Sequence, residues 1–141
     1  MVGGSAGLRR FRLQPPVVRE WPLQAQIAKL LTIEIAPAGH CSPWGVWWCS
    51  IDHANYGGIP ATRVRRGIIA GLGDLYVEHH GRAHWIELKA ADGRLTPAQR
   101  ELAGEIIKAE GRWALARSAD DVLALLDQWA VPRHRRTRVA A

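Results

Sequence analysis

The sequence has 141 residues, 48% of them hydrophobic, and 19 lysines and arginines against 13 aspartates and glutamates give a net charge of +6. This length suits one domain with its own core, and the apolar content excludes a disordered chain. The positive charge favours a polyanionic partner, with nucleic acid ahead of an anionic membrane surface. No apolar run approaches the roughly 20 residues of a membrane span. No secretory signal opens the sequence, so we expect a cytoplasmic protein.

The first predicted element is a helix preceded by a basic arm. Glycines, arginines and a proline pair predict that residues 1–16 are flexible or extended. A helix is predicted from about Trp21 to Ile33, because proline occupies its first turn and apolar residues follow at helical spacing. Glu20 and Gln24 stand four residues apart at its start and can face one place. Glu20 either joins a functional site or stabilises the helix N-terminus through the macrodipole.

An aromatic strand is predicted over residues 44–51. Its tryptophans are expected in the core, because both faces of a central strand are buried. Cys41 and Cys49, the only cysteines, are expected to be free thiols in a reducing compartment. Together with His40 and His53 they would offer four zinc ligands, but their spacing fits no standard zinc finger.

A short basic helix is predicted over residues 61–70, and it carries Arg63, Arg65 and Arg66. These arginines form either a phosphate-binding patch next to the following Gly-Leu-Gly loop or a solvated basic face. The loop is not of the nucleotide-binding type, since both the GxGxxG and the Walker patterns are absent.

Residues 74–89 are predicted to form a β-hairpin, because apolar and polar residues alternate on both sides of a turn signal at residues 80–82. If residues 81 and 82 form the turn, Asp74 lies opposite Lys89. If residues 80 and 81 form it, Asp74 lies opposite Glu87. Both registers place Asp74, Glu87 and Lys89 on one face and leave the other face to apolar side chains.

Two carboxylates and a lysine on adjacent strands suit phosphodiester chemistry. Magnesium takes oxygen ligands, usually one or two carboxylates with water and substrate phosphate. Such a metal polarises a phosphoryl oxygen and lowers the pKa of water. A neighbouring lysine can position that water or stabilise charge in the transition state. The alternative is a surface strand pair in which Lys89 bridges to Asp74 or Glu87.

The C-terminal third is predicted to add a helix, a strand and a last helix. Thr96-Pro97 begins a helix that runs over residues 98–110, with Gln99 in its first turn. A fourth strand is predicted at residues 113–116, and a helix then runs from a Ser118 cap through Trp129. The strand should join the sheet in parallel through a right-handed crossover. Residues 131–141 are expected to be a basic, disordered tail.

The order of these motifs resembles a known nuclease superfamily. Gly-x-Gly before Asp74, twelve intervening residues, Glu87-Leu88-Lys89 and then Gly-Arg-Leu-Thr-Pro-Ala before Gln99 look like the PD-(D/E)XK nucleases. Within that superfamily, the sequence is most similar to the small VRR-NUC (virus-type replication-repair nuclease) domain that stands alone in phages and prophages. The resemblance covers roughly residues 20–129. One departure is Gly73, which stands where the family usually has proline.

The resemblance implies a single α/β domain over residues 17–130, with a mixed four-stranded sheet flanked by helices in the order αβββαβ, plus a C-terminal helix. It implies a metal-dependent, structure-specific DNA endonuclease that uses Mg²⁺ or Mn²⁺. Branched DNA such as a four-way (Holliday) junction is the expected substrate, and a homodimer is the expected assembly. No membrane and no nucleotide cofactor is expected.

The resemblance also assigns roles to individual residues. It places the metal at Asp74, Glu87, the Leu88 carbonyl and Glu20, and it gives Lys89 the task of orienting or activating water. Gln99 is expected to hold water or a phosphate. A stretch similar to residues 52–58 lies near the substrate in the family, so Asn55 is a candidate DNA contact. The arginines of the basic segment, Arg63, Arg65 and Arg66, are the other candidate DNA contacts, as a patch that anchors the backbone. Two rivals are a non-cleaving DNA-binding accessory protein and an RNA-directed or tRNA-splicing-like nuclease. The intact set of Asp74, Glu87 and Lys89 weighs against the first, and the acidic pair weighs against the metal-free route of the second.

Overall fold

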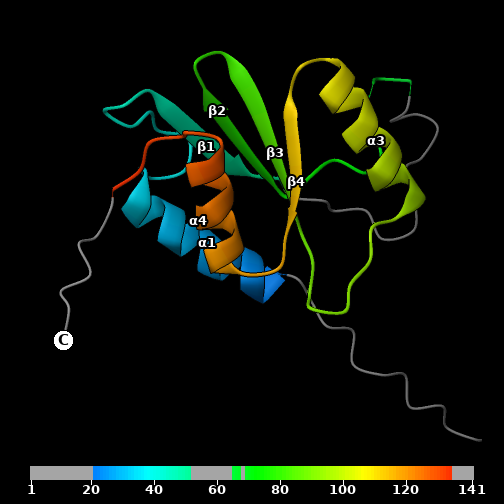
Figure 1. Ribbon diagram of the computed structural model, residues 1–141, viewed down its shortest axis with the longest axis horizontal. Coiled ribbons are helices and arrows are strands. Elements are labelled where there is room, and N and C mark those ends of the chain that lie inside the picture. The colour runs from blue at the N-terminus through cyan, green and yellow to red at the C-terminus, as the bar shows by residue number, and fades with distance from the viewer. Residues whose placement is uncertain (1–20, 52–64, 68, 135–141) are drawn as a thin grey trace, which may run out of the picture.

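The strands of the protein form one mixed sheet between helices (Figure 1). The computed structural model describes residues 21–51, 65–67 and 69–134. Its elements are α1 (Trp21–Glu34), β1 (Val46–Ser50), β2 (Leu75–His79), β3 (Arg82–Leu88), α3 (Pro97–Lys108), β4 (Arg112–Ala116) and α4 (Ala119–Gln128). The four strands lie in the order β1-β2-β3-β4. The first three are antiparallel and β4 is parallel to β3, which confirms the predicted α/β class and the parallel crossover.

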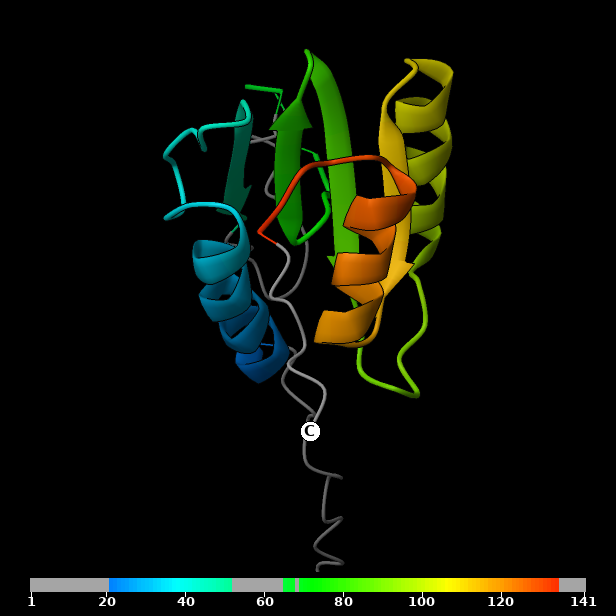
Figure 2. The ribbon, with the colours of Figure 1, turned by 60° about the vertical axis from the view of Figure 1, so that its left-hand side comes forward.

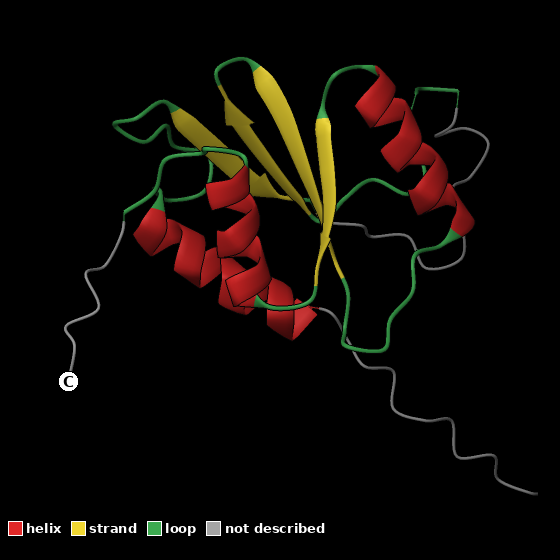
Figure 3. Cartoon of the chain, in the orientation of Figure 1, coloured by secondary structure: helices red, strands yellow, loops and turns green. Residues whose placement is uncertain are grey.

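The helices cover the two faces of the sheet unequally. Helices α1 and α4 lie over one face, whereas α3 lies on the other side next to β4 (Figures 1 and 2). The colouring by secondary structure in Figure 3 shows the strands between these two groups of helices. In the parts of the chain described, no helix is both long enough and apolar enough to cross a bilayer. The main core lies under α1 and α4 and includes Ile27, Leu31, Val46, Trp48, Leu75, Val77, Ile86, Leu88, Val122 and Leu126.

The turn between β2 and β3 decides the register of the hairpin. His80 and Gly81 have φ values of +51° and +69°, so the two central turn residues are both left-handed. This type of turn matches the right-handed twist of the flanking strands. Leu75 consequently pairs with Ile86, which is the second of the two registers predicted from the sequence.

Strand β1 lies at the edge of the sheet, so the expectation of a central strand with two buried faces was wrong. Trp48 points into the core and is 1% exposed, as expected for a tryptophan there. Trp47 lies on the opposite face, half-buried against Tyr76. Trp44 precedes the strand and is 40% exposed. Only alternate side chains of β1 reach the core, because α1 covers one face of the sheet.

The basic segment before the hairpin differs from its prediction where it is described. Residues 65–67 form a turn and residues 69–70 are not helical, whereas a helix was expected over 61–70. The rest of that segment lies outside the described residues. The expected N-terminal arm, residues 1–16, also lies outside them.

The folded chain continues past the expected domain boundary at residue 130. Val131 is 3% exposed, and the Arg133 guanidinium lies 3.0 Å from Glu34 and 2.9 Å from Asp127. The backbone N–H of His134 donates to the Glu34 carbonyl at 2.6 Å. Glu34 is only 4% exposed, and a buried carboxylate needs a charged partner, which Arg133 supplies. Residues 131–134 therefore belong to the domain, and the remainder of the expected tail lies outside the described residues.

A buried histidine makes the stability of this fold sensitive to acid. His84 is 2% exposed, and burial lowers its pKa, while the Val77 carbonyl partly opposes the shift. As the pH falls below 6.5, the unfolded chain takes up a proton that the folded chain resists, so stability decreases. We expect His84→Gln to reduce this decrease between pH 7 and pH 5, by at most about 1.4 kcal/mol per pH unit. Urea unfolding of the wild type and the variant at several pH values measures this loss of stability.

The matched control is His40→Gln, because His40 is exposed. This variant should keep the pH dependence of the wild type. An unchanged pH dependence in His84→Gln would contradict the assignment.

Candidate active site

The hairpin brings two carboxylates together at one end of the sheet. Asp74 immediately precedes β2, and because Leu75 pairs with Ile86, Asp74 lies opposite Glu87. The Asp74 Oδ2 atom accepts a hydrogen bond of 2.7 Å from the backbone N–H of Leu88. The Asp74 carboxylate is therefore held against β3, next to Glu87, as the sequence predicted.

Glu87 is a buried carboxylate with two polar partners. It is 2% exposed, and its Oε1 lies 3.0 Å from Lys89 Nζ and accepts a hydrogen bond of 2.5 Å from Gln99 Nε2. Lys89 is itself 8% exposed and shares the face of Glu87, because it follows two positions later on an extended chain. Burying a charge is costly unless it is paired and hydrogen-bonded, and these contacts supply that compensation. The ion pair is not a solvated surface bridge.

Gln99 connects the start of α3 to the carboxylate pair. Thr96 caps the helix, with its Oγ1 accepting from the Gln99 N–H at 3.2 Å. The Gln99 Oε1 accepts in return from the Thr96 N–H at 2.9 Å, which completes a capping box. The amide nitrogen of the same side chain donates to Glu87. One side chain thus fixes both the helix end and the buried carboxylate.

The glycine loop before Asp74 packs against the same turn of α3. Gly71 has φ +82°, and a Cβ at this position would lie 2.8 Å from the backbone C and O of Ala98. Only glycine can adopt this positive φ without strain and also avoid a clash with the backbone of Ala98. The loop and the Gln99 turn are therefore in contact, which ties the position of Asp74 to that of Gln99.

Two further residues hold the backbone around the carboxylates. The Gln24 side chain of α1 donates to the carbonyls of Asp74 at 3.1 Å and Ile51 at 3.3 Å. The sequence pointed to Gln24 only through its spacing from Glu20. Arg117, which follows β4, donates to the carbonyls of Ala90 at 2.5 Å, Ala91 at 3.3 Å and Gly93 at 2.8 Å. The sequence carried no signal for Arg117, because its partners are backbone atoms of a loop 24 to 27 residues away.

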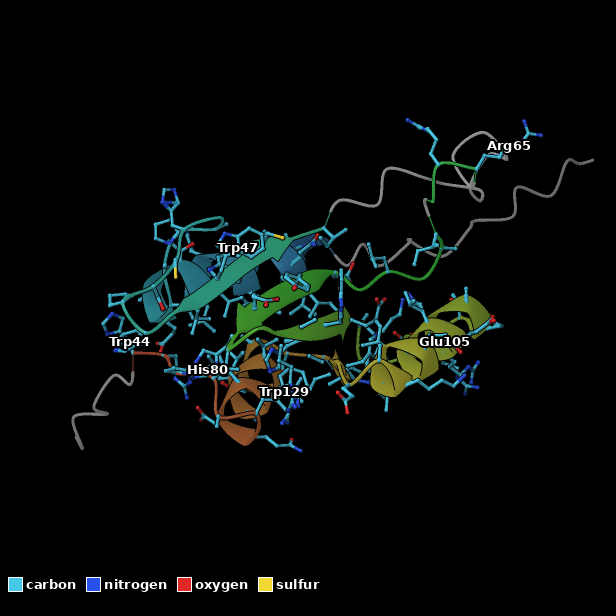
Figure 4. All side chains as sticks on the ribbon, turned by 90° about the horizontal axis from the view of Figure 1, so that it is seen from above. Trp44, Trp47, Arg65, His80, Glu105 and Trp129 are labelled. Atoms are coloured by element: carbon cyan, nitrogen blue, oxygen red, sulfur yellow. The ribbon has the colours of Figure 1, made fainter. Side chains whose placement is uncertain are left out.

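Those predicted DNA-contacting residues that the structure describes do not lie next to Asp74, Glu87 and Lys89. Arg65 and Arg66 are exposed in a turn, and Figure 4 shows Arg65 at the periphery, away from the hairpin. Asn55 and Arg63 lie outside the described residues, as does Glu20. The roles of these five residues stay predictions.

An aromatic pair borders the carboxylates on the same face of the sheet. Tyr76 and Trp85 stand two residues from Asp74 and Glu87 respectively, and their ring centroids lie 4.8 Å apart. The Tyr76 hydroxyl donates to Glu78, and burial together with Glu78 raises the pKa of Tyr76 to about 12. Tyr76 consequently stays protonated at neutral pH and does not serve as a base there.

The oxygen atoms at this end of the hairpin fit a hard divalent cation. Asp74 and Glu87 offer carboxylate oxygens, and the Leu88 carbonyl adds a neutral one. Among the described residues, no group of three or more His, Cys, Asp or Glu side chains forms a metal site. A cation that fills most of its shell with water and substrate, as magnesium does, suits two carboxylates better than zinc would. Cys41 and Cys49 are free thiols in the structure.

The contact between the glycine loop and α3 predicts a difference between two glycine substitutions. Gly45 has a similar φ of +77°, but no atom lies within 4 Å of its added Cβ. We expect Gly45→Ala to cost about 1 kcal/mol of unfolding free energy from left-handed strain alone. Gly71→Ala should cost about 1–3 kcal/mol more, because the methyl group also meets Ala98. Urea denaturation of both variants measures the difference. Equal losses of unfolding free energy would show that the contact with Ala98 does not contribute to stability.

The double role of Gln99 allows its two functions to be separated. Glutamate is an equally good capping-box residue, so Gln99→Glu keeps the acceptor for the Thr96 N–H. It replaces the donor to Glu87 by a second carboxylate, and we expect the pKa of Glu87 to rise through like-charge repulsion. Carboxyl-carbon NMR titration of Glu87 measures this shift.

Thr96→Ala is the control for Gln99→Glu, because it removes the cap hydroxyl at a cost of about 1 kcal/mol. It leaves the Gln99 amide in place, so the titration of Glu87 should be unchanged. A Glu87 titration that is the same in Gln99→Glu and in the wild type would refute the proposed contact.

Comparison with known proteins bears on the fold that carries this site. A solved structure described as a VRR_NUC domain protein is similar to the chain with a TM-score of 0.58 and 21% sequence identity. The similarity covers 78% of this chain and 86% of the other. No protein-family model and no curated protein matches the sequence. The likeness concerns the fold, because the identity is low. The chain thus has the fold of a VRR-NUC domain, which confirms the resemblance seen in the order of its motifs.

Proposed function

We propose that this protein is a metal-dependent endonuclease that hydrolyses phosphodiester bonds in DNA. The observation that carries the proposal is the meeting of Asp74, Glu87 and Lys89 at one end of the hairpin. The fold shared with a VRR_NUC domain protein supports a nuclease-type domain. A purely structural ion pair between Glu87 and Lys89 would not require the second carboxylate at Asp74.

Asp74 and Glu87 would hold a magnesium or manganese ion, with the Leu88 carbonyl and Glu20 as further candidates. When bound, the ion supplies Lewis-acid polarisation of a phosphoryl oxygen and lowers the pKa of water. Glu87 Oε1 already accepts from Gln99 and pairs with Lys89. These contacts would hold the lysine and the amide beside the metal-binding carboxylate, where both can act on the substrate.

Lys89 is the residue we assign to the attacking water and to the developing negative charge. Its ammonium group is buried and sits 3.0 Å from Glu87 Oε1. A donor in a water-poor site acts more strongly on developing charge than one in bulk water. Gln99 is anchored by the capping box and can present its N–H₂ to water or phosphate without rearrangement of α3.

We propose DNA as the substrate, branched DNA such as a four-way junction in particular, and a homodimer as the acting form. The net charge of +6 supports a polyanionic partner, and Arg65 and Arg66 are exposed in the segment before the hairpin. A protomer of 141 residues has little surface with which to grip two duplex arms. Two copies would bring two sites to one junction.

If the protein acts as a homodimer, light scattering of the protein in solution should give the mass of two chains.

The decisive experiment is cleavage of labelled four-way junction, flap and linear duplex with Mg²⁺ or Mn²⁺. We expect Asp74→Asn, Glu87→Gln and Lys89→Met each to lower the rate by about 10²-fold or more. The two carboxylate variants should also weaken Mn²⁺ binding in calorimetry, whereas Lys89→Met should not, because an ammonium is not a metal ligand.

Matched controls lie on the exposed face of α3, where Lys108 and Glu105 form an ion pair of 2.6 Å. Glu105→Gln and Lys108→Met make the same chemical changes and should leave cleavage unchanged. If the wild type binds DNA but cuts none of the substrates with either metal, the nuclease proposal fails and the protein is a DNA-binding accessory protein.

A further inference from the structure

The turn end of the β2–β3 hairpin carries a second cluster of polar side chains, far from the carboxylates. His79 pairs with Arg82 across the hairpin, and His84 pairs with Arg112 of β4. Directly paired residues share a face of a sheet, as do residues two apart on one strand. The side chains of His79, Arg82, His84 and Arg112 therefore lie on the same face. This is the face covered by α4, opposite to that of Glu87.

The end of α4 turns this cluster into a pocket. Trp129 packs against His84, with ring centroids 5.2 Å apart. An open pocket of about 300 Å³ results, lined by the four side chains together with His80, Trp129 and Ala130. Figure 4 shows His80 and Trp129 next to each other at this end of the molecule. A phosphate group is smaller than this volume, so part of a larger ligand would also fit.

The charge of the pocket is unbalanced. None of its lining residues is acidic. No described carboxylate lies within ion-pair distance of Arg82 or Arg112, whereas Asp127 of nearby α4 pairs with Arg133. The carbonyl end of α4 contributes about half a negative charge. That partial charge does not neutralise two guanidinium groups, which stay protonated at any relevant pH.

The histidines add donors to the same space. The His79 and His80 rings lie 4.0 Å apart, and His84 Nδ1 is 3.1 Å from the Val77 carbonyl. Burial lowers the pKa of His79, and the neighbouring His80 lowers it further. A bound anion would favour the protonated form of His79 and accept hydrogen bonds from the His79 and His80 rings and from the guanidinium groups.

We propose that this pocket binds a phosphate-class oxyanion through Arg82, Arg112 and the His79–His80 pair. Guanidinium forks match the oxygen geometry of phosphate, and several donors converge from three strands and the turn. Along β3, Arg82 and Glu87 are separated by about 16 Å, at about 3.3 Å per residue. The pocket is thus separate from the candidate active site. The proposal of an anion site does not depend on whether the protein cleaves DNA. The phosphate could belong to a nucleic-acid backbone or to a free phosphate.

The first arm of the test titrates the full-length protein with inorganic phosphate and follows the imidazole NMR signals. Saturable shifts are expected for His79 and His80 in the wild type, and chloride at equal ionic strength should not produce them. Arg112→Gln should weaken phosphate binding about tenfold or more, because it removes a charged hydrogen-bond donor.

Two variants keep this arm interpretable. Arg82→Gln changes an exposed residue at the turn, so its effect does not depend on the packing of α4. Lys29→Gln removes the same charge from an exposed position on α1 outside the pocket and should bind like the wild type. Absence of saturable shifts in the wild type, or equal affinity in wild type and both arginine variants, would overturn the proposal.

The second arm identifies the source of the phosphate. Duplex binding without metal is measured over a range of salt concentrations for the wild type and the Arg82→Gln/Arg112→Gln double variant. A backbone phosphate in the pocket predicts a salt slope smaller by about 1 in the double variant. An unchanged slope, with phosphate binding lost in the first arm, assigns the pocket to a free phosphate. Failure of the wild type to bind duplex would count against the proposed function and would leave the first arm decisive for the pocket.

Discussion

The burial of one carboxylate, that of Glu87, imposes the strictest requirement on this structure. A charge removed from water must be paired and hydrogen-bonded where it lies, or the fold loses several kcal/mol. The requirement is met from two directions, by Lys89 on the same strand and by Gln99 at the start of α3. Because Gln99 also closes the capping box, the placement of a whole helix is linked to one carboxylate. The glycine loop that delivers Asp74 then has to fit against that same helical turn.

Strand β3 serves two purposes because its side chains alternate between faces. His84, Ile86 and Leu88 point under α4 and α1, whereas Trp85 and Glu87 point to the side of α3. The hairpin is also polar at both ends but with opposite charge. Carboxylates gather where β3 ends, and arginines and histidines gather at the turn. The apolar middle of β2 and β3 keeps these two charged regions apart and holds each in a defined geometry.

Much of this could be predicted from the sequence, since it rests on local rules. Alternation in residues 74–89 predicted the hairpin, Thr96-Pro97 predicted the start of α3, and Ser118 predicted the cap of α4. The closeness of Asp74, Glu87 and Lys89 followed from side-chain period alone, in either register. The choice between registers did not, because it depends on whether a non-glycine residue, His80, accepts a left-handed φ.

The sequence by itself determined the class of fold, the order of its strands along the chain and the three residues at the centre of the candidate site. These depend on the side-chain period within each element and on short turn signals between elements, which a sequence displays directly. Only the tertiary structure decided that β1 lies at the sheet edge, that Arg133 pairs with Glu34 and that Arg117 supports the loop after Lys89. It also placed Arg112 next to His84 and so formed the basic pocket. Such contacts join residues far apart in the chain, and no local pattern specifies which distant partner a side chain will meet.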